Sequence, residues 1–143
     1  MKGLSLMGVH QCKACLVYCM DFRLHDSLTK FLAEQELVEA GADIIRVAGA
    51  IKSIAQPKQS RDRDFLLEML SVSYDLHGVR KFYLINHEDC GAYGPEEVPD
   101  SDEELAIHRD DLRSARALLK SLYPDVEVLT YFMWLSGKAD LVK

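Results

Sequence analysis

The sequence lacks a long apolar run and has little of what marks special protein classes. No uninterrupted apolar stretch approaches the ~18 residues of a membrane span. Residues 1–9 have neither the apolar length of a signal peptide nor a small-residue cleavage site. Four cysteines in 143 residues are too few for a disulfide scaffold, and three of them lie within residues 12–19. We therefore expect a cytoplasmic protein whose cysteines are reduced or bind a metal.

Positive charge is also scarce. The chain has 17 Lys and Arg against 23 Asp and Glu, a net charge of −6, which argues against a nucleic-acid-binding surface. It has no low-complexity segment or internal repeat, and its 48% hydrophobic and 28% charged residues are typical of a globular protein. A chain of this length commonly forms one domain, so we expect residues 1–143 to fold around a single core.

Short apolar runs alternate with amphipathic segments along the chain. The apolar runs predict four strands, at residues 13–19, 43–47, 80–86 and 126–135. Helical spacing of apolar residues, with capping residues and closing glycines, predicts three helices, at residues 26–41, 61–78 and 101–124. This order indicates an α/β domain with a mostly parallel central sheet flanked by helices, to which residues 139–142 can add an antiparallel edge strand.

Three soft metal ligands follow the ends of two expected strands. Cys19 ends the first strand, while His87 and Cys90 follow the third. Because the carboxyl ends of parallel strands meet at one edge of a sheet, we expect these three side chains to lie together. Two thiolates and one imidazole suit Zn²⁺ and leave its fourth tetrahedral position open, as catalysis requires.

Two charged residues lie next to Cys19. In "CMDFR", residues 19–23, Asp21 and Arg23 share a face with the cysteine because alternate residues of an extended segment point the same way. A guanidinium keeps a carboxylate ionised and oriented, so Asp21 could accept a hydrogen bond from a zinc-bound hydroxide, or could itself bind the metal and close the site. In "RVAGA", residues 46–50, the small residues allow close backbone approach, and the segment either begins a helix whose N-terminus favours an anion or forms an ordinary tight turn.

Together, "CMDFR", "RVAGA" and "HEDCG" (residues 87–91) resemble the motifs of the β-class carbonic anhydrases in content and order. The resemblance implies a β-carbonic-anhydrase-like fold in which Cys19, His87 and Cys90 bind zinc and Asp21 and Arg23 form the catalytic dyad. It implies reversible hydration of carbon dioxide to bicarbonate in a homodimer or higher homo-oligomer. His25 and His108 are candidate proton shuttles, because an imidazole titrates near pH ~6.5.

Several alternatives remain open. One is a hydrolase of a related heterocumulene, carbonyl sulfide or carbon disulfide, since certain family relatives use the same zinc site in this way. Another is a catalytically silent zinc-binding module in which Asp21 closes the metal site. A third is a closed structural site made of Cys12, Cys15, His87 and Cys90, although we favour Cys12 and Cys15 as buried small apolar residues.

Overall fold

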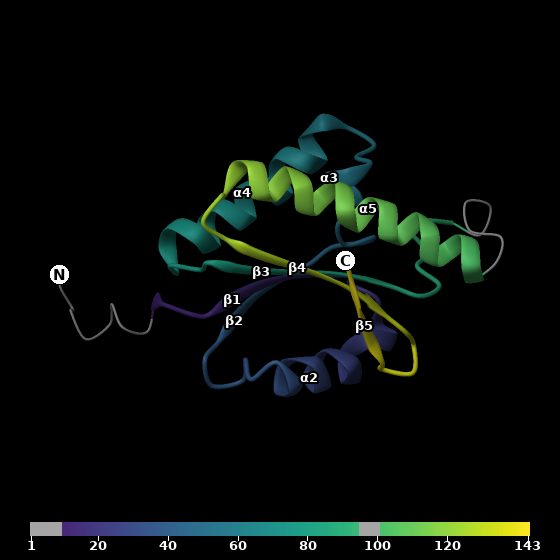
Figure 1. Ribbon diagram of the computed structural model, residues 1–143, viewed down its shortest axis with the longest axis horizontal. Coiled ribbons are helices and arrows are strands. Elements are labelled where there is room, and N and C mark those ends of the chain that lie inside the picture. Colours follow the sequence, from purple (N-terminus) through teal and green to yellow (C-terminus); the bar gives the residue numbers. More distant parts are fainter. Residues whose placement is uncertain (1–9, 95–100) are drawn as a thin grey trace.

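A five-stranded sheet organises the chain in the computed structural model, which describes residues 10–94 and 101–143 (Figure 1). The predictions for the amino-terminal nine residues and for part of the polar loop before residue 101 lie outside these ranges. The strands run in the order β2-β1-β3-β4-β5. Their bounds are β1 Ala14–Tyr18, β2 Ala42–Arg46, β3 Lys81–His87, β4 Glu127–Met133 and β5 Ala139–Val142.

The sheet is parallel except at one edge. β1 pairs in parallel with β2 and with β3, and β3 pairs in parallel with β4. β5 returns antiparallel to β4. All five residues of β1 are buried, which explains its continuous apolar run, because helices cover both faces of the sheet. The predicted fold class and the antiparallel edge strand are confirmed.

Helices cover the two faces of the sheet unequally (Figure 1). α2 lies on one face, while α3, α4 and α5 lie on the other. On the α2 side, Phe31 makes edge-to-face contacts with Tyr83 and Tyr131. No described helix is both long enough and apolar enough to cross a membrane. The helical elements are η2 Phe22–Leu24, α2 His25–Glu34, α3 Lys52–Ala55, α4 Ser60–Leu76 and α5 Ser101–Leu122.

The predicted helix at 26–41 is too long. α2 ends at Glu34, and Glu36 adopts a left-handed backbone conformation with φ of 58°. The backbone N–H of Leu37 bonds to the carbonyl of Leu32 at 2.8 Å, which closes the helix end. This turn buries the Leu37 side chain, which is 1% exposed. Gly41, expected to end the helix, instead leads into β2 with φ of 85°.

The "RVAGA" segment forms a tight turn rather than the start of a helix. Gly49 and Ala50 both have positive φ, and α3 begins only at Lys52 and has four residues. Of the two alternatives for residues 48–50, the tight turn is therefore confirmed, and the helix start is wrong. The expected close approach is present, because a Cβ atom at Gly49 would lie 3.0 Å from the Cβ of Ala92. This contact brings the turn after β2 against the turn after β3.

Candidate metal centre

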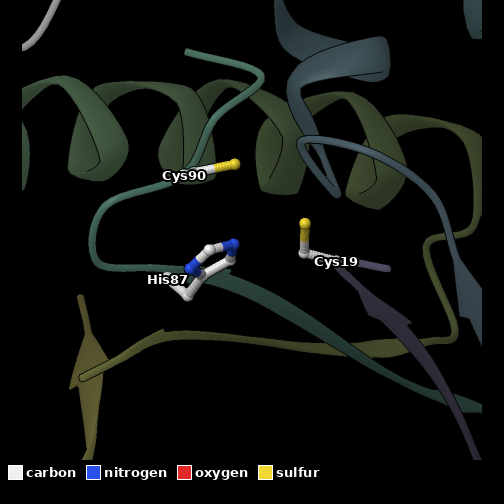
Figure 2. Close-up of side chains that lie close together, drawn as sticks. All are labelled: Cys19, His87 and Cys90. Atoms are coloured by element: carbon white, nitrogen blue, oxygen red, sulfur yellow. The ribbon is translucent and has the colours of Figure 1, made fainter. Parts of the chain in front are cut away.

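Cys19, His87 and Cys90 meet at the carboxyl edge of the sheet. Each offers one donor atom, and these three atoms lie within 4.8 Å of one another; all three residues are buried. Figure 2 shows both sulfur atoms and the imidazole ring facing a common space. The register of β1 and β3 explains why these residues lie together. Val17 pairs with Leu84, so Cys19, two residues further on, lies level with the end of β3.

The sheet separates the other two cysteines from this centre. Cys15 pairs with Phe82 near the start of β3, five residues before His87. At ~3.3 Å per residue this distance along the strand is too long for a shared metal ion. The alternative closed site of Cys12, Cys15, His87 and Cys90 is therefore wrong, because its members lie at opposite ends of the sheet. Cys15 is fully buried, as expected, whereas Cys12 is only half-buried.

The ring of His87 is oriented as a metal ligand requires. Its Nδ1 lies 2.7 Å from the backbone carbonyl of Glu88, and a carbonyl only accepts, so Nδ1 carries the proton and donates. The other nitrogen, Nε2, then presents a lone pair. This atom is buried and has no hydrogen-bond partner. A buried acceptor without a partner is costly, and a cation at this position would satisfy it.

The two thiols influence each other's protonation strongly. The neighbouring Cys90 thiol and the proximity of the His87 ring lower the pKa of Cys19 and outweigh the opposing effect of burial. The neighbouring Cys19 thiolate, together with burial, in turn raises the pKa of Cys90. Without a cation, Cys19 therefore readily loses its proton, while Cys90 keeps its proton. A divalent cation stabilises both thiolates, so this donor set fits Zn²⁺.

Asp21 and Arg23 stand beside the three donors. The guanidinium of Arg23 donates to both carboxylate oxygens of Asp21, with the shortest contact 2.7 Å from Nη2 to Oδ2. The Arg23 backbone N–H adds a bond of 2.9 Å to Oδ1. These bonds lower the pKa of Asp21 to about 2. The carboxylate is therefore ionised and fixed near His87, with 4.0 Å between Oδ2 and Nε2.

Two acidic residues whose contacts at this site were not predicted from the sequence complete this arrangement. The guanidinium of Arg23 also donates to Asp89, at 3.1 Å to its carboxylate and 2.9 Å to its carbonyl. Asp89 has a left-handed φ of 56°, and its backbone N–H donates to Glu104 of α5 at 2.7 Å. Asp89 lies inside the "HEDCG" motif and could have been noticed there. Glu104 lies fourteen residues beyond Cys90. The sequence pattern of Ser101 and Glu104 predicts only a capping box at the start of a helix, not this contact with Asp89.

Arg46 holds the loop that carries the dyad. Its guanidinium donates to the backbone carbonyls of Cys19 and Asp21, each at 3.0 Å. A third bond of 2.8 Å reaches Nδ1 of His25 at the start of α2. β2 ends at Arg46, which pairs with Tyr18 on β1, so the side chain lies beside the loop that it supports.

The two candidate shuttle histidines lie in different surroundings. His25 is exposed next to the dyad loop. His108 is 0% exposed, and its Nδ1 accepts from the Asn86 amide at 2.9 Å. Burial and the nearby His87 lower the pKa of His108 to about 4. A neutral histidine without solvent contact does not suit proton exchange, so the structure does not support His108 as a shuttle.

A cleft opens in front of the centre. It has a volume of about 690 Å³ and is largely apolar at its mouth, where Met20 and Phe22 are exposed. Such a lining suits a small uncharged molecule more than a charged one. The residues that line it include Cys19, Asp21, Ala48, Gly49, Gly91 and Ala92.

Comparisons with known proteins agree with this geometry. A family model described as "Putative carbonic anhydrase" matches residues 9–143. An uncharacterized protein of Rickettsia conorii is 26% identical over 141 residues, which cover 96% of this chain and 75% of that protein.

Solved structures share the fold at low sequence identity. A carbonic anhydrase from Glaciozyma antarctica is 22% identical, with a TM-score of 0.61 over 96% of this chain and 88% of that one. A tetrameric β-carbonic anhydrase of Sordaria macrospora is 12% identical, with a TM-score of 0.63 over 96% and 84% of the two chains. A carbon disulfide hydrolase is 16% identical, with a TM-score of 0.57 over 96% and 83%. Because the family match spans almost the whole sequence, the chain belongs to this family of putative carbonic anhydrases, and its fold is that of the β-carbonic anhydrases.

Proposed function

We propose that this protein is a zinc-dependent lyase that catalyses the reversible hydration of carbon dioxide to bicarbonate. The observation that carries the proposal is the buried set of two thiols and one imidazole nitrogen beside a carboxylate fixed by arginine. Cys19, His87 and Cys90 would hold the zinc ion. When bound, zinc lowers the pKa of water to about 7 and so makes a hydroxide nucleophile available near neutral pH.

The surrounding residues supply orientation and a suitable environment. Asp21 is ionised and can only accept hydrogen bonds, so it would accept one from the O–H group of the nucleophile and orient a lone pair of that oxygen toward the cleft. Arg23 keeps Asp21 charged and in place through several hydrogen bonds. The apolar side chains at the cleft mouth admit carbon dioxide and reduce competing contacts with water.

A second candidate is hydrolysis of carbon disulfide or carbonyl sulfide. It is favoured by one specific observation, the fold shared with a carbon disulfide hydrolase. Both substrates are linear and uncharged like carbon dioxide, so the largely apolar mouth of the cleft suits them as well. A silent zinc module closed by Asp21 is less favoured, because Arg23 already occupies both carboxylate oxygens.

We further propose that residues 1–143 form one cytoplasmic zinc-binding domain that assembles into a homodimer or higher homo-oligomer. The tetrameric relative from Sordaria macrospora supports assembly. The exposed Met20 and Phe22 at the cleft mouth offer apolar surface that a neighbouring subunit can cover. The expected substrates are carbon dioxide and bicarbonate, and the negative net charge supports the prediction that nucleic acid is not a partner.

Stopped-flow measurement of carbon dioxide hydration tests the proposal, with zinc content determined on the same sample. We expect a zinc-dependent rate that is lost in Cys90→Ser and retained in Cys15→Ala, which removes a thiol outside the centre. A folded, zinc-loaded protein with no rate above buffer would contradict carbonic anhydrase activity. Sulfide release from carbon disulfide or carbonyl sulfide in that sample would establish the second candidate instead.

A further inference from the structure

A second group of metal-type donors lies at the opposite end of the sheet. Cys12 precedes β1, Asp43 lies in β2, and His77 caps the C-terminus of α4. One donor atom from each lies within 4.8 Å of the other two. The amino ends of β1 and β2 are adjacent, and the Cys12 backbone N–H donates to the His77 carbonyl at 3.2 Å. The backbone of three separate elements thus holds the three side chains together.

The cleft around this group favours a cation. It has a volume of about 470 Å³, and neither Lys nor Arg is among the residues that line it. Asp43 and Glu39 provide carboxylates. His77 follows the last residue of the 17-residue helix α4, where the unpaired carbonyls carry partial negative charge. The lining therefore combines acidic side chains with a helix end of the same sign.

The present hydrogen bonds show how a metal ion could enter. Asp43 Oδ2 lies 2.6 Å from Nδ1 of His77 and accepts a bond of 2.7 Å from the Ser73 hydroxyl. A cation between Asp43 and His77 would replace the proton that these two atoms share. Zinc bonds of ~2.0 to 2.3 Å place tetrahedral donors roughly 3.3 to 3.8 Å apart. The donors of Cys12, Asp43 and His77, which lie 2.6 to 4.8 Å apart, thus need an adjustment of about 1 Å.

A fourth donor, His10, lies near the cluster but outside the 4.8 Å that unites the other three donors. The ring of His10 stacks toward that of His77, with 6.3 Å between the ring centroids, and it lines the same cleft. One thiolate, one carboxylate and two imidazoles form a donor set that suits Zn²⁺ and similar divalent transition metals. With four protein ligands, a metal ion would have no open position, which is typical of structural sites.

We propose that Cys12, Asp43 and His77, with His10 as the fourth donor, form a second, structural site for zinc or a similar divalent transition metal. The bound ion ties the residues before β1 to β2 and to the end of α4. It is independent of the catalytic proposal, because the two clusters lie at opposite ends of the sheet and share no residue.

Zinc stoichiometry after saturation and desalting tests the second site. We expect two zinc ions per wild-type chain and one in Cys12→Ser and in His77→Gln, while Cys15→Ala keeps two as the matched control. In the cobalt-substituted protein, Cys12→Ser should reduce thiolate-to-cobalt charge-transfer absorbance by about a third, since one of three ligating thiolates is lost.

An unchanged zinc content in either folded variant, relative to wild type, would overturn the proposal. Circular dichroism establishes which variants fold; if Cys12→Ser does not, His77→Gln decides, because glutamine can still donate a hydrogen bond to Asp43. Cys90→Ser separates the two proposals. It should lose the zinc ion at the first centre and keep the one bound by Cys12 and His77.

Discussion

The carboxylate of Asp21 lies 4.0 Å from the free ring nitrogen of His87, although the two residues are 66 positions apart in sequence. Asp21 belongs to the loop after β1 and His87 ends β3, and parallel pairing of these strands brings them together. The contact links the proposed metal ligands to the proposed dyad. The ionised Asp21 carboxylate therefore lies where it could accept a hydrogen bond from a nucleophile held at the metal and so orient that nucleophile.

Removing the charge of Asp21 should reduce turnover without releasing zinc. In Asp21→Asn, the side chain keeps its size but can donate as well as accept, so it no longer selects one orientation of the nucleophile. We expect kcat for carbon dioxide hydration to fall by roughly 10²- to 10³-fold, as for the loss of a catalytic hydrogen-bonding group. Stopped-flow kinetics with zinc analysis checks this, and loss of zinc in the variant would assign Asp21 to the metal shell instead.

Truncating Arg46 should loosen the loop that carries Cys19 and Asp21. Arg46→Ala removes charged donors from two backbone carbonyls, and hydrogen bonds of this kind contribute about 1.5 to 3 kcal/mol each. Because Arg46 is only half-buried, water replaces part of the lost donation, and we expect the free energy of unfolding to fall by about 2 kcal/mol in total, measured by urea denaturation. Arg61→Ala, an exposed position on α4, is the matched control and should change it by less than about 0.5 kcal/mol. Equal effects in the two variants would show that the Arg46 contacts add nothing to stability.

Glu104 should matter for metal affinity although it does not touch the centre. Its carboxylate accepts the backbone N–H of Asp89, next to Cys90. In Glu104→Ala this turn loses its anchor on α5, and we expect zinc affinity to fall about 10- to 100-fold, as for other residues that orient metal ligands. Competition with a chelator measures the affinity. Asp102→Ala, in the same helical turn and exposed, should bind zinc as tightly as wild type.

His108 should make the fold sensitive to mild acid. Burial and nearby His87 lower its folded pKa to about 4, from an ordinary value of 6.5, so the unfolded chain binds this proton more readily. The stabilisation that neutral His108 provides is complete above pH ~6.5 and is lost as the pH falls toward 4, by about 3 kcal/mol at most.

His108→Gln should remove this part of the pH dependence, because glutamine offers Asn86 an acceptor but does not titrate. Urea denaturation of wild type and variant over this pH range measures it. The two stability curves should run parallel above pH ~7 and converge or cross below pH ~6. Parallel curves throughout would exclude His108 as the source.

The sequence determined the fold class and the first cluster because both depend on simple patterns. The short, β-favouring apolar run at residues 13–19 predicted a buried strand, and the alternation of strands with helices predicted parallel neighbours. The carboxyl ends of parallel strands lie at the same edge of a sheet, so the proximity of Cys19, His87 and Cys90 could be predicted from the sequence. Their metal-binding role stays a prediction, as does catalysis by Asp21 and Arg23.

Tertiary structure decided what depends on contacts between distant segments. α2 ends at Glu34, where the chain turns and buries Leu37. Local helix propensity does not predict this tertiary contact. The partnership of Glu104 with Asp89, and the meeting of Cys12 with Asp43 and His77, need particular helix positions on the sheet. Periodicity and capping act over a few residues and can be read along the chain. Packing joins side chains across the whole molecule, and only the folded chain fixes which of them meet.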